Sequence, residues 1–325
     1  MKKVVYFVLL ALGFSSCEND LDINAAWVET PVVYGFIDAF KDTQDIRIQK
    51  TFQNSADMSI REGAQLVDSL YFDSLVVRVI GSDGRIDTFH KVPLPKQSGV
   101  FQNGTHYIYR RIGFKPGNSG ISKSYRLEIF NPSSGKSYIS NPTSLVDSAR
   151  FGTSGNFIGL TPATATGEMG SVSYNMTAGT NSAIYDLFIR FYYLETYIDN
   201  SSQIKYIDYV LQKNWPSSGI ASRYTISLYG KSYFDYLNSA IKFNSNVSSR
   251  TYLRVENFAC GGTADLAYIT DLSQPSATIV PKNTQYTNIP GALGIFSSLS
   301  VHSIRLRETK PDKLAEVIKL LPQFN

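Results

Sequence analysis

Residues 185–197 read YDLFIRFYYLETY. Polar Asp186 and Arg190 occupy one set of alternate positions, and apolar or aromatic side chains fill the other, namely Tyr185, Leu187, Ile189, Phe191 and Tyr193. A period of two is expected of a half-buried β-strand, because successive side chains point to opposite faces. The segment therefore predicts one long strand and indicates a mainly β chain.

Shorter strands precede this one. A strand–turn–strand signal covers 75–89, with Gly81-Ser82-Asp83-Gly84 as the turn. Strands of mostly five to eight residues at this spacing favour an Ig-like β-sandwich for 26–150. The other predicted strands lie at 31–37, 45–52, 107–114, 124–131 and 137–139, while 55–66 fits either a short helix or an excursion over the sheet.

Residues 151–325 are predicted to form a second β-rich domain. Further strands are expected at 206–211, 251–260, 264–271 and 291–296, after a stretch at 152–182 that fits a loop, a domain boundary or a weak strand. The apolar period changes to helical spacing near 232–242, with Ser232 as the N-cap. A C-terminal helix is expected near 311–321, with Pro311 in its first turn.

The N-terminus has the pattern of a bacterial export signal. Lys2 and Lys3 precede an apolar run, 4–14, that is shorter than the roughly 20 residues needed to span a bilayer. Small residues then lead to Cys17, as in a lipobox, although Phe14 stands where leucine is commoner. We expect residues 1–16 to be a signal peptide and Cys17 to carry the lipid, such as palmitate, with 17–25 as an acylated tether. An ordinary secretory signal with a chance cysteine is the alternative.

An acidic stretch, Glu18-Asn19-Asp20, follows that cysteine directly. It resembles the surface-export signal of Bacteroidota lipoproteins, although a solvated acidic tether would look the same. The expected location is therefore the outer membrane, with the lipid-anchored chain facing the cell surface.

Composition excludes several classes of protein. Losing Lys2 and Lys3 with the signal peptide lowers the formal net charge of +4 by two, which argues against nucleic-acid binding. Cys260 is the one cysteine besides Cys17, so neither an intramolecular disulfide nor a cysteine metal cluster is expected. His90, His106 and His302 are isolated, and the sequence contains neither a Gly-x-Ser-x-Gly elbow nor a phosphate-binding glycine loop. We expect no catalytic residue, no metal and no cofactor.

Several segments resemble a domain-of-unknown-function family of Bacteroidota lipoproteins, whose members are often encoded near TonB-dependent outer-membrane receptors. The likeness rests on Cys17 and on the segments 32–37, 46–52, 125–129 and 288–298. The resemblance implies a surface lipoprotein with an accessory role. Three tripeptides around Ser69, Ser74 and Ser148 look like the O-glycosylation sequence of exported Bacteroidota proteins, or they reflect turn chemistry.

Three hypotheses for function remain. The first is a non-enzymatic accessory subunit of an outer-membrane β-barrel, either TonB-dependent receptor-like or an envelope-biogenesis barrel. The second is a glycan or peptide capture protein serving a TonB-dependent transporter, with Tyr206, Tyr209 and Trp215 as its ligand platform. The third is a surface hydrolase, for which Glu195 and Asp199 are candidate carboxylates beside a tyrosine-rich strand.

Overall fold

The computed structural model describes residues 28–51, 70–94, 105–120, 122–152, 157–158, 170–217, 222–272 and 286–308, with the single residues 318, 321 and 324. Several predicted features lie outside the described residues. They are Cys17, Glu18, Asn19, Asp20, Ser69, the undecided segment 55–66 and, apart from the isolated residues 318 and 321, the expected helix over 311–321.

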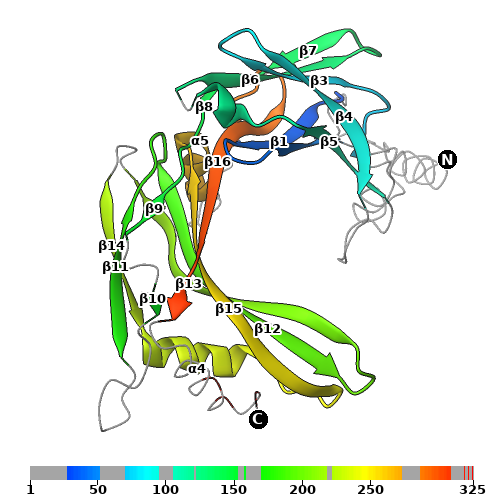
Figure 1. The fold of residues 1–325 in the computed structure, drawn as a ribbon. Coiled ribbons are helices and arrows are strands. Elements are labelled where there is room, and N and C mark those ends of the chain that lie inside the picture. Colours follow the sequence, from blue (N-terminus) through cyan, green and yellow to red (C-terminus); the bar gives the residue numbers. More distant parts are fainter. Residues whose placement is uncertain are drawn as a thin grey trace, which may run out of the picture.

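The chain is mainly β and has the outline of a C (Figure 1). The prediction of a mainly β, sandwich-like fold is confirmed. A sheet of twelve described strands runs through the whole molecule in the order β13-β12-β15-β16-β1-β2-β5-β4-β3-β6-β7, with β8 also paired to β6. We call residues 28–146 with 286–298 the sandwich, and residues 147–272 with 299–308 the arm.

The sandwich contains short strands folded into two layers. They are β1 (Pro31–Asp38), β2 (Thr43–Lys50), β3 (Val76–Gly81), β4 (Ile86–Leu94), β5 (His106–Ile112), β6 (Ser124–Asn131), β7 (Lys136–Ile139) and β8 (Thr143–Ser144), with a 3-10 helix η2 (Pro116–Ser119). Strand β4 joins the layers, because residues 86–89 pair with β3 and residues 90–94 pair with β5.

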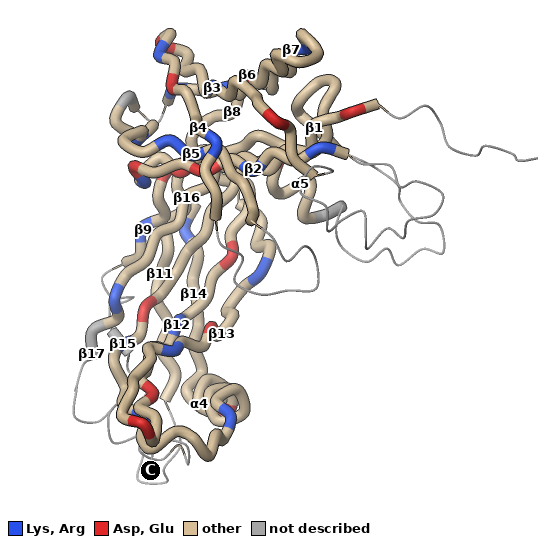
Figure 2. The backbone as a smooth tube through the Cα atoms, turned by 90° about the vertical axis from the view of Figure 1, so that its right-hand side faces the viewer, with Lys and Arg blue, Asp and Glu red and all other residues tan. Residues whose placement is uncertain are grey.

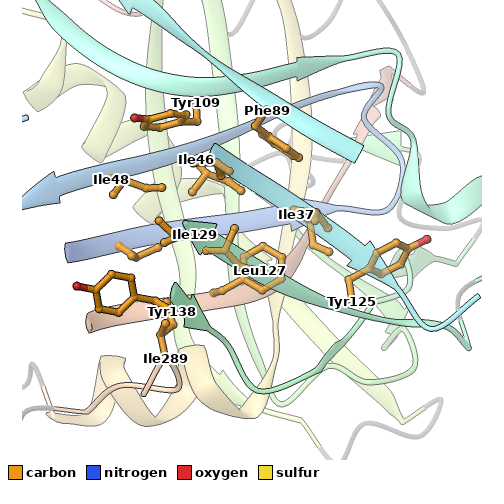
Figure 3. Close-up of a cluster of buried hydrophobic side chains, with 14 of the residues drawn as sticks. Ile37, Ile46, Ile48, Phe89, Tyr109, Tyr125, Leu127, Ile129, Tyr138 and Ile289 are labelled. Atoms are coloured by element: carbon orange, nitrogen blue, oxygen red, sulfur yellow. The ribbon is translucent and has the colours of Figure 1, made fainter. Parts of the chain in front are cut away.

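One hydrophobic core fills the space between these layers (Figure 3). Its strands alternate buried and exposed positions, as half-buried strands should. Fully or almost fully buried side chains from both layers meet there, including Val33, Ile37, Ile46, Val77, Phe89, Leu127 and Ile129.

The C-terminal part of the chain completes this core. Strand β16 (Leu293–Arg305) pairs in parallel with β1, and Ile289, Ala292 and Phe296 join the sandwich core. Gly294 has φ 84°, and a Cβ there would lie 2.0 Å from the carbonyl oxygen of Val33, so this close approach requires glycine. The sequence-based division at residue 150 did not anticipate this shared strand.

The arm consists of longer elements. They are β9 (Arg150–Phe151), β10 (Phe157–Ile158), β11 (Ser171–Thr177), β12 (Ile184–Tyr197), β13 (Ser202–Pro216), β14 (Arg223–Tyr229), α4 (Gly230–Ala240), β15 (Val247–Gly262), α5 (Ala264–Leu272) and β17 (Arg307–Glu308). One face of β12, β13 and β15, the inner face, packs against α4 and the sheet β14-β11-β9 through two hydrophobic clusters.

Helix α4 confirms the helix predicted near 232–242, but its start differs. The N-cap is Tyr229 rather than Ser232, and its side chain makes no capping hydrogen bond. The expected cap was wrong because β14 runs directly into the helix. Burial of Tyr233, Phe234 and Leu237 fixes the helix instead.

The strand expected at 264–271 is wrong, because these residues form α5. The carbonyl of Thr263 accepts a hydrogen bond from the backbone N–H of Ala267, which starts the helix, and Asp265 lies in its first turn. Gly262 lets the helix approach the sheet, since a Cβ there would lie 2.4 Å from Leu266 Cδ2. None of the described helices is long and apolar enough to cross a bilayer.

Candidate binding surface and pocket

The outer face of the arm is the face of β12, β13 and β15 opposite α4, and β16 continues it. Strand register places Asp208, Arg190, Glu256 and Arg305 side by side, so that charge alternates in sign across four strands. The residues next to this charged row are largely aromatic. We define the outer face by the following residues: Phe188, Arg190, Tyr192, Tyr206, Asp208, Val210, Arg254, Glu256 and Phe258.

Arg190 organises the middle of this face. Its Nε and one terminal nitrogen donate to the two carboxylate oxygens of Asp208 at 2.6 and 2.8 Å. The same guanidinium lies 4.1 Å from the ring centre of Tyr206 and 5.0 Å from that of Phe258. The hydrogen bond to Asp208 raises the pKa of Arg190, so this position stays cationic. The fork and the ring contacts hold the side chain in one orientation.

Arg254 repeats this arrangement beside it. Its guanidinium lies 3.8 Å from the ring centre of Tyr192, and its Nε donates to Glu256 Oε1 at 2.6 Å. Phe188 and Phe258 stack with centroids 4.8 Å apart. These contacts order large side chains on a surface that faces solvent.

The edge of this face is strongly exposed. Ile204, Tyr206 and Val210 on β13 are 57%, 55% and 57% exposed. Seen from the open side of the C, charged residues of both signs are distributed along the arm (Figure 2). Interface hot spots are enriched in tyrosine, tryptophan and arginine, so this surface is suited to holding another molecule.

A pocket of about 230 Å³ lies on the same side of the sheet, beneath α5. Apolar groups form most of its wall, and Asp186, Lys213, Asn214 and Thr270 contribute polar side chains. Cys260 also lines it, and burial raises the pKa of its thiol to about 11. The thiol is therefore almost wholly protonated at neutral pH and a poor nucleophile.

A second pocket lies at the tip of the arm. It measures about 600 Å³ and is lined by Tyr197, Ile198, Asp199, Ser201 and Asn246. The Ser201 hydroxyl and backbone N–H bond to the Asp199 carboxylate and lower its pKa. The Asp199 carboxylate is thus bonded within its own turn.

Glu195 sits close to this turn but is already engaged. Its carboxylate accepts hydrogen bonds from Arg250 Nε at 2.9 Å and from the Tyr197 hydroxyl at 3.2 Å. The side chains of Arg250 and Glu195 are only 6% and 8% exposed. A carboxylate held in this way supports the arm structurally, whereas a general acid or nucleophile must reach a substrate.

No protein-family model matches the sequence, and no curated protein matches it. Among solved structures, the chain is similar to the C-terminal globular domain of an oligosaccharyltransferase from Pyrococcus abyssi, at 9% identity and a TM-score of 0.26. The alignment covers 72% of this chain and 48% of that one, about half its length. A TM-score this low does not indicate a shared fold. The lipoprotein-family resemblance stays a prediction.

The three residues predicted as a ligand platform all lie on β13, but they do not share one surface. Tyr206 is on the outer face, beside Tyr192 and Arg190. Tyr209 packs on the inner face against Tyr233 of α4, and Trp215 packs against Tyr224 in the neighbouring cluster. Tyr206 alone of the three is presented beside the open outer face.

The other predicted sites are dispersed. Ser74 is exposed and Ser148 is half-buried, with its hydroxyl donating to the carbonyl of Ala149 at 3.2 Å, so their glycosylation stays a prediction. His302 lies against Phe151, and the His106 ring is hydrogen-bonded to Tyr71. Within the described ranges, no group of three or more His, Cys, Asp or Glu side chains could hold a metal ion.

Sequence reasoning missed most of the outer face and the pocket. A signal for the first was available, since Phe188 and Tyr192 alternate with the buried set in β12 and make both faces of that strand aromatic. The pocket had only the weak signal of two adjacent glycines, Gly261 and Gly262. The rest of its lining comes from four strands and a helix. The pairing register of these strands decides which of their side chains lie next to one another.

Proposed function

We propose that this protein is a lipid-anchored, non-enzymatic subunit of the outer membrane, displayed at the cell surface, that binds a protein partner through the outer face of its arm. The proposed partner is the extramembrane surface of an outer-membrane β-barrel, either TonB-dependent receptor-like or an envelope-biogenesis barrel. The single observation that carries the proposal is the ordered, exposed arrangement of arginine and aromatic rings on that face.

Two physical arguments support partner binding. Arg190 and Arg254 are held by carboxylates and rings before any partner arrives, so association immobilises fewer side chains and loses less entropy. The alternating charge row also favours a partner with the complementary pattern and disfavours a surface with one sign of charge. The lipidated Cys17 predicted from the sequence would keep this face beside the membrane proteins it meets.

The test is affinity purification of the tagged full-length protein from native outer membranes in mild detergent, followed by mass spectrometry. We expect a barrel protein at a stoichiometric level. The double variant Tyr206→Ser/Val210→Ser should lower its recovery by about tenfold or more, since a hot-spot contact contributes roughly 2 kcal/mol.

The sandwich supplies a matched control. Ile86 and Ile112 are 58% and 66% exposed there, so Ile86→Ser/Ile112→Ser removes similar apolar surface away from the arm. Recovery with this control should equal that of the unaltered protein. Recovery of the lipoprotein alone, or equal losses in both double variants, would overturn the proposal.

Ligand capture is a second candidate function, and the pocket beneath α5 favours it. Its size is below the roughly 300–1,000 Å³ of pockets for drug-sized ligands. The ligand would therefore be smaller than an oligosaccharide. An equilibrium-dialysis screen of small metabolites tests this candidate, and an absence of any saturable ligand would contradict it.

A further inference from the structure

The pocket beneath α5 has an apolar interior. Ile184 of β12, Leu266 of α5, and Leu299 and Val301 of β16 contribute aliphatic side chains to it. Cys260 adds a small, protonated thiol. The aliphatic part of this lining favours an aliphatic or aromatic group of a few carbon atoms, because burying such a group removes apolar surface from water.

An irregularity in the sheet brings two opposite charges to this pocket. Tyr185 pairs with Trp215 and Leu187 with Gln212, so Lys213 and Asn214 together face Asp186. Asn214 has φ 54°, a left-handed conformation, and its backbone N–H donates to Asp186 Oδ1 at 2.8 Å. Bulges of this kind re-aim side chains and recur beside functional sites.

The two charged groups remain separate. Asp186 and Lys213 face each other across the bulge, and both line the pocket. Among the residues that the structure describes, no ion pair joins their side chains. The Lys213 ammonium has no hydrogen-bond or salt-bridge partner in the part of the chain that the structure describes. The pocket thus offers one unused cation and one anion with a free carboxylate oxygen, next to an apolar interior.

We propose that this pocket binds a free, zwitterionic α-amino acid with an apolar side chain. Its ammonium group contacts Asp186, its carboxylate contacts Lys213, and its side chain enters the space beneath α5. The size is consistent with this ligand class, because a leucine- or phenylalanine-sized molecule is much smaller than the ligands of larger pockets. The inference is independent of the proposed partner-binding face, which lies further along the arm.

Cys260 provides a built-in reporter for the test. Although alkylation of this protonated thiol is slow, a ligand in the pocket should slow its reaction with a small reagent such as iodoacetamide further. Mass spectrometry of the peptide that contains Cys260 measures its labelling separately from every other site. Thermal unfolding of the full chain gives a second reading, because a ligand that binds the folded state raises the melting temperature.

Matched ligands separate the three contacts. We expect L-leucine, at concentrations up to about 10 mM, to slow labelling of Cys260 and to raise the melting temperature. Leucinamide lacks the carboxylate and 4-methylpentanoate lacks the amine. Each should bind at least about tenfold more weakly, since a hydrogen bond to a charged group contributes roughly 1.5–3 kcal/mol. Glycine, which lacks the side chain, should show no effect.

Variants locate the site. Lys213→Gln should abolish the discrimination between L-leucine and leucinamide, whereas Lys213→Arg should retain it. Asp186→Asn keeps an oxygen to accept the Asn214 N–H while losing the charge, so the bulge should persist and binding should fall. Lys231→Gln, on the far side of the arm in α4 and 80% exposed, is the control and should bind as the unaltered protein does.

The outcomes are decisive in either direction. Equal binding of L-leucine, leucinamide and 4-methylpentanoate would overturn the zwitterion assignment. No protection of Cys260 by any of them would overturn the site. Because partner recovery from membranes measures the outer face separately, failure of this inference would leave that proposal unaffected, and the converse also holds.

Discussion

The sandwich and the arm both consist mainly of β-strands, but they differ in which side chains occupy the two faces of those strands. In the sandwich, strands of two to nine residues bury one face in a single core between two layers. In the arm, strands β12, β13 and β15 extend over 14 to 16 residues and carry large side chains on both faces. One core-facing stripe is enough to stabilise a sheet, so the second aromatic face of the arm supports the proposal that it binds a partner.

The largest expected effect is in the arm, where Glu195 and Arg250 form a nearly buried ion pair. Glu195→Ala should lower the free energy of unfolding by about 3–5 kcal/mol, because it leaves a buried guanidinium without this carboxylate. Urea unfolding followed by circular dichroism measures the change.

Asp45→Ala in the sandwich is the control for that prediction. The Arg110–Asp45 pair has a similar distance of 2.7 Å, but its side chains are 31% and 43% exposed. Its loss should change stability by about 1 kcal/mol or less. Equal effects of the two substitutions would contradict the distinction between a buried arm pair and a surface sandwich pair.

The next effect concerns the sandwich core. Leu127 is fully buried between the layers, so Leu127→Ala should cost about 2–5 kcal/mol through lost burial and a residual cavity. Ile86→Ala, at an exposed position of β4, should change stability by roughly 0.5 kcal/mol or less. Comparable losses from both would show that the core does not lie where the buried alternation places it.

A smaller effect on stability is expected at the outer face of the arm. Tyr206→Ser removes a cross-strand contact with Tyr192 and a ring contact with Arg190, which contributes roughly 1 kcal/mol or less. The same substitution should weaken partner recovery far more than it weakens the fold. A loss of stability as large as that from Leu127→Ala would mean that this face supports the structure rather than a partner.

The smallest effect is a dependence on pH. Burial lowers the pKa of His302, so the unfolded chain takes up a proton at this residue more readily than the folded chain does. The stabilising contribution is present above the unfolded pKa of about 6.5 and is lost as the pH falls below it. His302→Gln should therefore lose less stability than the unaltered protein between neutral pH and mildly acidic pH, measured by thermal unfolding. A parallel loss in both proteins would contradict this contribution.

Local sequence patterns predicted much of the fold. The alternation in 185–197 gave the strand β12, and the helical spacing of Tyr233, Leu237 and Ile241 gave α4. Both signals are strong because periodicity depends only on which side chains are buried along one element. Periodicity could not predict helix α5, because its short sequence fits both the helical and the strand period. Its position depends on Gly262, which lets Leu266 approach the sheet, and on Tyr286 and Asn288, which donate hydrogen bonds to Asp265.

By itself, the sequence determined the mainly β class and the long strand β12, while the signal peptide and the lipidated Cys17 stay predictions. Only the tertiary structure decided that β16 returns to β1, that Tyr206 and Tyr209 lie on opposite faces, and that Asp186 and Lys213 share a pocket. The physical reason is the range of the interactions. Periodicity and turn chemistry act within a few residues, whereas strand order, bulges and pockets arise from pairings between segments that the local sequence does not specify.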